Sequence, residues 1–339
     1  MSLSNRLKRI GFDSYLLLLL GTVVVASLLP AQGVGAEVLS RVVYFAVALL
    51  FFLYGAKLNT SAIVAGLSNW RLQALVFAST FIAFPLVGLA LSSALSPWLR
   101  PEIVIGMLYL AVLPSTVQSS IAFTSIAHGN VPAAVCAASI SNLLGVFITP
   151  IFAALLLHTS GEGGFDLGSM VDIGVQILLP FIVGQLARPL VGKFIQRHAR
   201  ITQIVDRGSI LLIVYSAFSA GMVAGIWQQV DASTLAIMIG ADAVLLAVIL
   251  VGTSFIGRIS GLAREDRLVL LFCGSKKSLA SGLPMANILF AGQTVSLIVL
   301  PLMIFHQIQL FVCAVIAQRE GHKASEQMAD IGAGKAIIT

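Results

Sequence analysis

Two adjacent lysines, Lys276 and Lys277, interrupt an apolar run of the sequence, in the segment CGSKKSLASGLP at residues 273–284. An ammonium group at the centre of a bilayer costs at least about 2.5 kcal/mol, and such groups usually mark a functional site. Adjacent residues of a helix point about 100° apart, so the two ammonium groups cannot serve one purpose there. The sequence therefore predicts two separate charged positions within one segment.

A second interrupted run, LPSTVQSSIAFTS at residues 113–125, offers oxygen atoms instead of charges. Pro114 removes a backbone donor, and every position from Ser115 to Ser120 except Val117 is polar. Hydroxyl, amide and freed backbone oxygens are suitable ligands for Na⁺. The candidate cation ligands are Ser115, Thr116, Gln118 and Ser119, together with Ser139 and Asn142 from the next run. The last two lie three residues apart, on one helical face. The alternative is that these hydroxyls only allow helices to pack closely.

The composition indicates which elements hold these residues. Of 339 residues, 58% are hydrophobic and 10% are charged, and the mean hydropathy is +1.00, far outside the range of soluble domains. A bilayer core requires about 20 apolar residues per helix. The sequence predicts an all-α polytopic membrane protein with ten spans, at residues 14–30, 38–56, 72–95, 103–127, 131–157, 169–187, 208–226, 234–256, 268–291 and 293–317.

The basic residues predict the orientation of these spans. All but four of the twenty lysines and arginines fall in the expected loops of one side; the exceptions are Arg41, Arg100 and the lysine pair. Positive loops stay cytoplasmic, so we expect both termini in the cytoplasm of a multi-pass cell-membrane protein, the inner membrane in a bacterium. The net charge of +6 is thus a topology signal, and no nucleic acid or partner protein is expected. The alternative for residues 1–36 is a cleaved signal peptide.

The ten spans divide into two halves of five, and an odd number per half requires an inverted second copy. The polar interruption falls in the fourth span of each half, near Thr116 and near Lys276. Such paired breaks indicate a binding site at the bilayer midplane. The predicted units are a first repeat at 1–157, an external connection at 158–168, a second repeat at 169–317 and a disordered cytoplasmic tail at 318–339.

Several motifs resemble the bile acid:sodium symporter superfamily, and its SBF-like branch most closely. They are PSTVQSS at 114–120, AHGNVPAAVCAASISNLLGVFITP at 127–150 and GSKKSLASGLPMANILF at 274–290, within a resemblance that covers residues 10–317. The resemblance implies a core of helices 3–5 and 8–10, a panel of helices 1, 2, 6 and 7, and crossed discontinuous helices 4 and 9. It also implies transport of an organic anion together with sodium.

The resemblance implies one sodium site close to that of the family and one that departs from it. Gln118 and Ser119 stand where better-known members carry Ser and Asn, whereas Phe272, Lys276 and Thr80 replace a glutamate and two glutamines. A second cation about 4 Å from an ammonium group is repelled by about 4 kcal/mol at an effective dielectric constant of about 20. We therefore expect the Lys276 ammonium to replace one bound sodium.

Lys277 is expected near the start of the second half-helix, facing a central cavity and pairing with an anionic substrate. Snorkelling to a membrane face is the alternative. The other candidate substrate contacts are Ser120, Ser275, Ser278, His306 and Gln307. Gln309 is expected to face the core together with His306 and Gln307. His306 can titrate near neutral pH; the simpler alternative is a buried histidine held by one hydrogen bond.

Asp242 lies inside the eighth span, as a candidate counter-ion for a lysine or a proton-coupling group; the alternative is an interfacial residue. No cofactor is expected beyond Na⁺ or H⁺, and Cys136, Cys273 and Cys313 lack a metal or disulfide pattern. No enzyme is expected either, because the GSKKS segment lacks the first glycine of a phosphate-binding loop and the sequence has no H-E-x-x-H, G-x-S-x-G or S-x-x-K motif. The predicted function is secondary active transport, with a proton-coupled carrier or a non-transporting regulatory protein as alternatives. The sequence does not identify the substrate.

Overall fold

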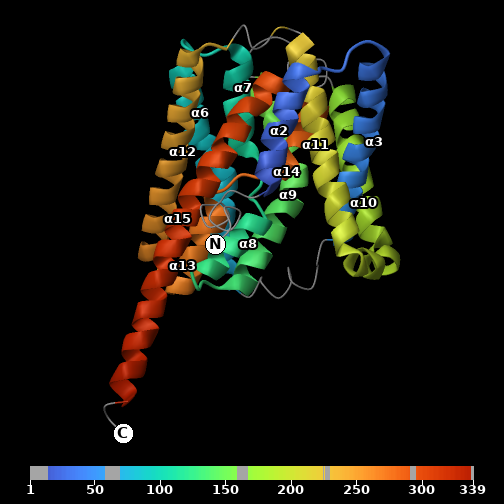
Figure 1. Ribbon diagram of the computed structural model, residues 1–339. Coiled ribbons are helices and arrows are strands. Elements are labelled where there is room, and N and C mark those ends of the chain that lie inside the picture. Colours follow the sequence, from blue (N-terminus) through green and yellow to red (C-terminus); the bar gives the residue numbers. More distant parts are fainter. Residues whose placement is uncertain are drawn as a thin grey trace.

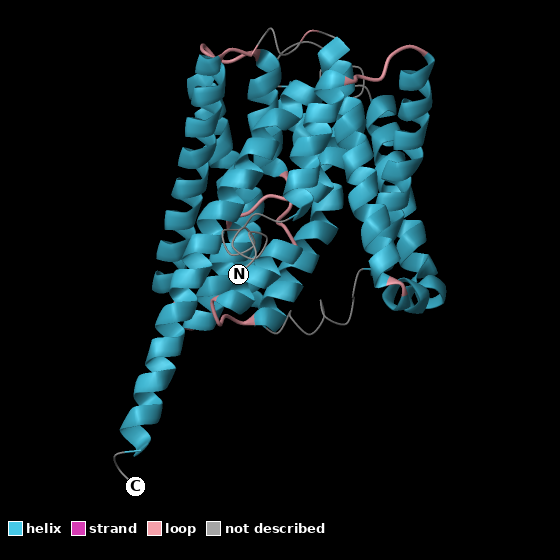
Figure 2. Ribbon diagram, in the orientation of Figure 1, coloured by secondary structure: helices cyan, strands magenta, loops and turns pink. Residues whose placement is uncertain are grey.

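The computed structural model describes residues 14–57, 69–158, 167–223, 225, 230–290 and 295–336, and within these ranges every regular element is a helix (Figure 2). The helices run roughly parallel or antiparallel in one bundle (Figure 1). In chain order they are α2 (Ser14–Leu28), α3 (Val34–Lys57), α5 (Trp70–Ala78), the π-helical turn η2 (Ser79–Ala83), α6 (Phe84–Leu95), α7 (Pro101–Val112), α8 (Gln118–Ile126), α9 (Val131–His158), α10 (Leu167–Arg197), α11 (Ala199–Val223), α12 (Ala232–Ile259), α13 (Arg264–Gly274), α14 (Leu279–Leu289) and α15 (Val295–Ala336).

The predicted all-helical membrane architecture is confirmed. In the described ranges, seven helices are long and apolar enough to cross a bilayer, counting the run from α5 through α6 as one. The predicted fourth and ninth spans are each divided into two short helices, α7 with α8 and α13 with α14. Most of the expected external connection, and residues 1–13, lie outside the described residues.

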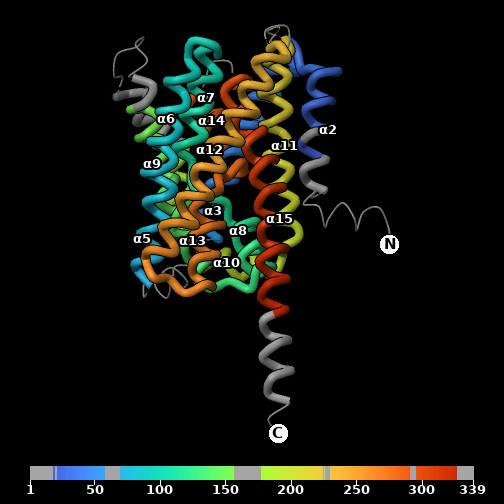
Figure 3. The backbone as a smooth tube through the Cα atoms, turned by 90° about the vertical axis from the view of Figure 1, so that its left-hand side faces the viewer, coloured from blue at the N-terminus to red at the C-terminus, as the bar shows by residue number. Residues whose placement is uncertain are grey.

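We expected a disordered tail at 318–339, and this expectation was wrong for residues 318–336, which are helical. Helix α15 continues through these residues and extends well beyond the end of the bundle (Figures 1 and 3). The segment AQREGHKASEQMADIGAGKA is rich in alanine, glutamate, lysine and glutamine, which favour helix, and it contains no proline. Charge and polarity alone therefore pointed to the wrong local structure.

The third span widens in its middle. Helix α5 passes into the π turn η2 and then into α6, whose second residue is Pro85. Proline has no N–H for the helical ladder, and π turns relieve such interruptions while leaving backbone carbonyls without their usual partners. The carbonyl of Thr80 lies in this turn.

Helices α2, α3, α10 and α11 form one side of the bundle, where α3 packs along α10 and α2 along α11 (Figure 1). Two glycines bring the α3 and α10 backbones together. A Cβ atom on Gly55 would lie 2.0 Å from the Phe181 carbonyl oxygen, and one on Gly184 would lie 2.0 Å from the Phe52 oxygen. No side chain fits at either position, so this seam depends on glycine.

The remaining helices surround the two divided spans. Helix α15 packs along α7 and α12, while α13 lies against α5, α8, α9 and α12. Large apolar side chains on the outside of the bundle are exposed, among them Leu86, Leu190, Val251 and Phe255. In a chain with long apolar helices, such side chains face lipid.

A polar cluster fastens the end of the bundle at which α13 begins. The Asp266 carboxylate accepts hydrogen bonds of 2.8 Å from both Asn69 and Asn130. The two asparagines use their own oxygens to cap the next helices, accepting from Leu72 N and Ala133 N. One carboxylate therefore connects the starts of α5, α9 and α13.

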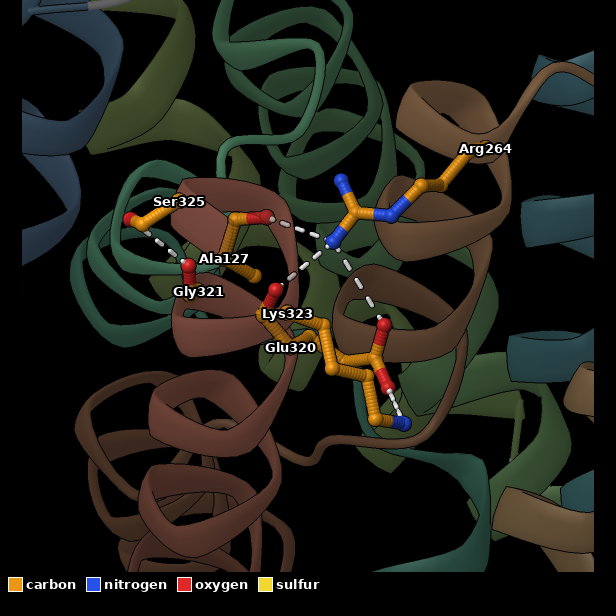
Figure 4. A network of polar contacts seen from close by, with 6 residues as sticks. All are labelled: Ala127, Arg264, Glu320, Gly321, Lys323 and Ser325. Atoms are coloured by element: carbon orange, nitrogen blue, oxygen red, sulfur yellow. Dashed lines mark hydrogen bonds and ion pairs between the residues drawn. The ribbon is translucent and has the colours of Figure 1, made fainter. Parts of the chain in front are cut away.

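Arg264 makes a second connection at this end (Figure 4). Its guanidinium donates to the Glu320 carbonyl oxygen at 2.8 Å and to the Ala127 carbonyl oxygen at 3.4 Å, and a Glu320 carboxylate oxygen lies 3.5 Å away. Beside it, a Cβ atom on Gly321 would lie 2.4 Å from the Ile126 carbonyl oxygen. Arginine and glycine thus bind the end of α8 to α15.

Arg264→Gln is expected to lower the free energy of unfolding by about 1 kcal/mol, because the partly buried Ala127 and Glu320 carbonyls lose their donor. Thermal unfolding in lipid nanodiscs measures the change. Arg258→Gln, which removes an exposed arginine from α12, serves as the control and should have a smaller effect. Equal effects would show that the connection adds nothing.

Candidate functional site

The two divided spans meet inside the bundle. Helix α7 ends at Val112 and α8 begins at Gln118, while α13 ends at Gly274 and α14 begins at Leu279. The linking segments touch directly, since Ser278 N donates to the Pro114 carbonyl at 2.9 Å. Both predicted breaks are confirmed, and they lie against each other.

Hydroxyl groups satisfy the carbonyls freed at the end of α13. The carbonyl oxygens of Phe272, Cys273 and Gly274 accept hydrogen bonds from Ser120 at 3.0 Å, Ser115 at 2.6 Å and Ser79 at 2.8 Å, respectively. These donors come from α8, from the α7–α8 link and from η2. A bilayer interior supplies no water to such groups, so these hydroxyls stabilise the break.

The carbonyls freed at the end of α7 are satisfied mainly by one ammonium group. Lys277 Nζ donates to the carbonyl oxygens of Ala111 at 2.8 Å and Leu113 at 2.7 Å. It also donates at 2.8 Å to Thr80 O in the π turn. The carbonyl between the first two, that of Val112, accepts from Thr149 Oγ1 at 2.8 Å.

Lys277 is completely buried, and its surroundings resemble the ligand shell of a bound cation. An ammonium group has three N–H donors, and here all three have a carbonyl acceptor. The Phe84 ring lies under the charge, with its centroid 4.2 Å from Nζ, and Phe81 lies 5.9 Å away. The Lys277 ammonium thus points into this carbonyl shell in the structure, whereas we expected it to face a central cavity and an anionic substrate.

Lys276 is also completely buried but keeps hydrogen-bonding capacity. Among the described residues its Nζ makes one long hydrogen bond, 3.4 Å to Ser119 Oγ, and otherwise lies over the rings of Phe123 at 4.2 Å and Phe272 at 5.7 Å. The position we expected for Lys276, among oxygens in place of an ion, is thus occupied by Lys277. The direction of each lysine side chain depends on the backbone conformation of the segment between α13 and α14. The spacing of residues in the sequence does not determine that conformation.

Most of the predicted cation ligands are brought together. Thr116 Oγ1 shares hydrogen bonds of 2.8 Å with the hydroxyls of Ser119 and Ser120. Asn142 Nδ2 donates to Ser115 O at 2.8 Å, which joins α9 to the break. Two candidates stay apart: Gln118 is exposed at the start of α8, and Ser139 lies partly buried on α9, neither with a polar contact to this cluster in the described part of the chain.

The predicted substrate contacts lie on several different elements. Ser275, directly after α13, donates through Oγ to Leu271 O in the last turn of that helix, and Ser278 caps α14 by accepting from Ser281 N at 3.1 Å. His306 lies on α15, where its ring contacts Gln309. Gln307 has a buried carbonyl oxygen without a hydrogen-bond partner among the described residues.

Asp242 is completely buried on α12, and neither carboxyl oxygen has a hydrogen-bond partner within the described ranges. Met238 and Ala241 beside it belong to an apolar cluster with Ile103 and Met107 of α7. The structure forms no ion pair between Asp242 and either lysine, so the expected counter-ion contact is absent from the described residues.

The site also contains a buried polar residue, Gln309, without an assigned role in our predictions. Gln309 Oε1 accepts from Lys277 N, and Gln309 Nε2 donates to Lys277 O, both at 2.8 Å. This side chain pairs with the backbone of the break as a neighbouring strand would. A glutamine inside an apolar span was the only signal in the sequence.

Two divided helices that meet within a multi-pass helical bundle are typical of membrane transporters. The sequence model of the SBF-like CPA transporter family matches residues 13–321, and the chain belongs to this family. It is 51% identical over 317 residues to "Uncharacterized protein PA2026" of Pseudomonas aeruginosa, covering 94% of this chain and 95% of that one.

Two further relatives have names that state a function. "Putative symporter YfeH" of Escherichia coli K12 is 46% identical over 307 residues, or 91% of this chain and 92% of that protein. "Sodium/bile acid cotransporter 7" of Rattus norvegicus is 27% identical over 326 residues, or 93% and 94% of the two chains. The chain is therefore a multi-pass membrane protein of a transporter family, and such a protein handles a small-molecule substrate in a lipid bilayer.

Proposed function

We propose that this protein is a secondary active transporter of an organic anion, in which the Lys277 ammonium replaces one coupling sodium ion. The observation that carries the proposal is the set of three carbonyl oxygens, from Thr80, Ala111 and Leu113, around Lys277 Nζ. Freed carbonyls at half-helix ends are the groups that coordinate Na⁺ in transporters with discontinuous helices. Here the Lys277 ammonium, a cation that is tethered because it is part of the chain, occupies the place of such an ion.

Electrostatics argue against a sodium ion beside this group. Two unit charges about 4 Å apart repel each other by about 4 kcal/mol at an effective dielectric constant of about 20. The carbonyls of Phe272, Cys273 and Gly274 are also engaged, by serine hydroxyls. A sodium ion would have to displace these donors, so we infer a carrier that does not depend on two sodium ions per cycle.

Lys276 is the better candidate for the anion contact. Its ammonium has one long hydrogen bond, to Ser119 on the first turn of α8. That helix begins without a side-chain cap, and Gln118 at its start is exposed. Uncapped N–H groups and the positive end of the helix dipole favour an anion, and a carboxylate or sulfonate there would gain Lys276 as a partner.

Alternating access requires two bodies that move against each other. We assign α2, α3, α10 and α11 to a panel and the other helices to a core. In this proposal the two halves of the chain are inverted repeats of five helices each. The panel helices α2, α3, α10 and α11 pack most extensively against one another and meet the core through α9, α14 and α15, which supports the assignment. Helix α14 lies between them, and Tyr54 on α3 donates to Ala280 O at 3.1 Å. A contact of this kind can break without disturbing the core.

The proposal predicts that transport uses no more than one sodium ion per cycle. In proteoliposomes, uptake of an anion from a panel that includes a conjugated bile acid should depend on the sodium concentration with a Hill coefficient no greater than about 1, as a single ion site requires. Lys277→Gln should introduce sodium-dependent thermal stabilisation, since it removes the tethered charge from the carbonyls.

Two results would contradict this function. Uptake by the unmodified protein that requires two sodium ions per cycle would refute the tethered-cation mechanism. Binding of an anion, seen as a thermal shift, without uptake of any anion would favour the non-transporting regulatory role. Lys276→Gln is the matched control, because it should weaken anion binding without creating a response to sodium.

A further inference from the structure

The Gln309 side chain has an orientation that the surrounding backbone determines. Its two 2.8 Å contacts with Lys277 involve a backbone N–H, which only donates, and a backbone carbonyl, which only accepts. The amide oxygen must therefore face Lys277 N, and the amide nitrogen must face Lys277 O. This removes the usual ambiguity between oxygen and nitrogen in a glutamine side chain.

The same amide nitrogen lies 2.8 Å from His306 Nδ1, one turn earlier on α15. A glutamine NH₂ group has two hydrogens; one is given to Lys277 O, and the other points at the histidine. His306 Nδ1 must therefore accept. The ring is consequently neutral, with its proton on Nε2.

We propose that His306 Nδ1 is a proton-binding site, and that proton binding there releases the clamp of Gln309 on Lys277. A proton on Nδ1 would face the NH₂ group of Gln309, so two donors would oppose each other. The amide cannot turn over, because its oxygen would then face Lys277 O and its nitrogen Lys277 N.

Release of Gln309 would also affect the Lys277 ammonium, the tethered cation. The Lys277 backbone is held by Gln309, and its side chain holds the end of α7 and the π turn. Loosening the backbone frees the segment between α13 and α14. His306 is partly exposed, and proton binding requires that this exposed part of the ring meets water and not lipid. The inference rests on the proposed transport function and adds a coupling ion to it: H⁺, bound at α15.

Few other charged groups act on this ring. The Lys276 ammonium does, and it repels a second positive charge. The described parts of α8 and α14 contain no titratable residue. The remaining titratable groups on the neighbouring elements are Glu102 and Tyr109 on α7, Arg200, Asp206, Arg207 and Tyr215 on α11, Asp242 and Arg258 on α12, Arg264, Glu265, Asp266, Arg267 and Cys273 on α13, and Cys313, Arg319, Glu320, His322, Lys323 and Glu326 on α15 itself. Tyr109 and Tyr215 donate to the carbonyls of Gly282 and Leu29.

The test needs neither a substrate nor a transport assay. In nanodiscs, ¹⁵N-labelled histidine reports the protonation state of each ring nitrogen, and His306→Asn identifies the signal of His306 among the five histidines. At neutral pH, Nδ1 should be unprotonated and Nε2 protonated. On lowering the pH from 7 to about 3.5, where a buried histidine becomes protonated, the exchange rate of the Lys277 amide hydrogen, corrected for intrinsic exchange, should rise on the order of tenfold, as expected for loss of one or two hydrogen bonds.

Two variants separate the switch from a general effect of acid. His306→Asn keeps an acceptor oxygen near the Nδ1 position that cannot take a proton, so exchange at Lys277 should become independent of pH. Gln309→Leu should give fast exchange at every pH. The inference is overturned if His306 carries its proton on Nδ1 at neutral pH, or if His306→Asn keeps the pH dependence of the unmodified protein. Neither result bears on whether the protein transports an anion.

Discussion

Lys277→Met is expected to lower the free energy of unfolding by about 3 kcal/mol, because three buried carbonyls lose their donor and each unsatisfied group costs about 1–3 kcal/mol. Removing the ammonium also removes its own desolvation cost, which offsets part of the loss. Methionine is unbranched and only one heavy atom shorter than lysine, and its apolar end suits the Phe84 ring, so packing changes little. Chemical denaturation in mixed micelles measures the difference, and transport should be lost.

Lys276→Met is the matched control for this prediction. It removes an equally buried ammonium that has one hydrogen bond, of 3.4 Å. The loss of that contact and the relief from desolvation nearly cancel, so the stability should change by less than about 1 kcal/mol. The order of the two variants is the decisive measurement. If Lys276→Met is the more destabilising, the assignment of the cation position to Lys277 is wrong.

The two breaks could be predicted because their causes are local. Pro114, Gly274 and a cluster of polar side chains interrupt apolar runs that otherwise read as continuous helix. The helical class followed in the same way from composition and the lengths of the apolar runs. These features depend only on what neighbouring residues can do in a bilayer.

The exchange of roles between the two lysines could not be predicted. Lys277 reaches Thr80 O because η2 widens the third span, 197 residues earlier in the chain. Nothing in the sequence except Pro85 pointed to that turn. The family positions led to Lys276, because alignment compares places along the chain and contains no information on side-chain direction. Likewise, Gln309 acquires its role only when α15 packs beside the break.

Gly184→Ala should be about as damaging as the loss of Lys277, although it adds only one methyl group. The new Cβ atom would lie 2.0 Å from the Phe52 carbonyl oxygen and 2.8 Å from its carbon. Backbone atoms cannot move aside as a flexible side chain can, so α3 and α10 must separate along the seam. Overpacking of this kind costs about 1–3 kcal/mol, and separation also loses the contacts on either side. Thermal unfolding in nanodiscs should show a lower midpoint.

Gly55→Ala should cause a similar loss, since its Cβ atom would lie 2.0 Å from the Phe181 oxygen. The double variant should be less damaging than the sum of the two, because helices already separated by one methyl group have room for the other. Gly252→Ala on α12 is the control: nothing lies within 4 Å of its Cβ position, and alanine favours helix over glycine by up to about 1 kcal/mol. A strictly additive double variant, or a loss at Gly252 equal to that at Gly184, would mean that close backbone contact does not determine the stability of this seam.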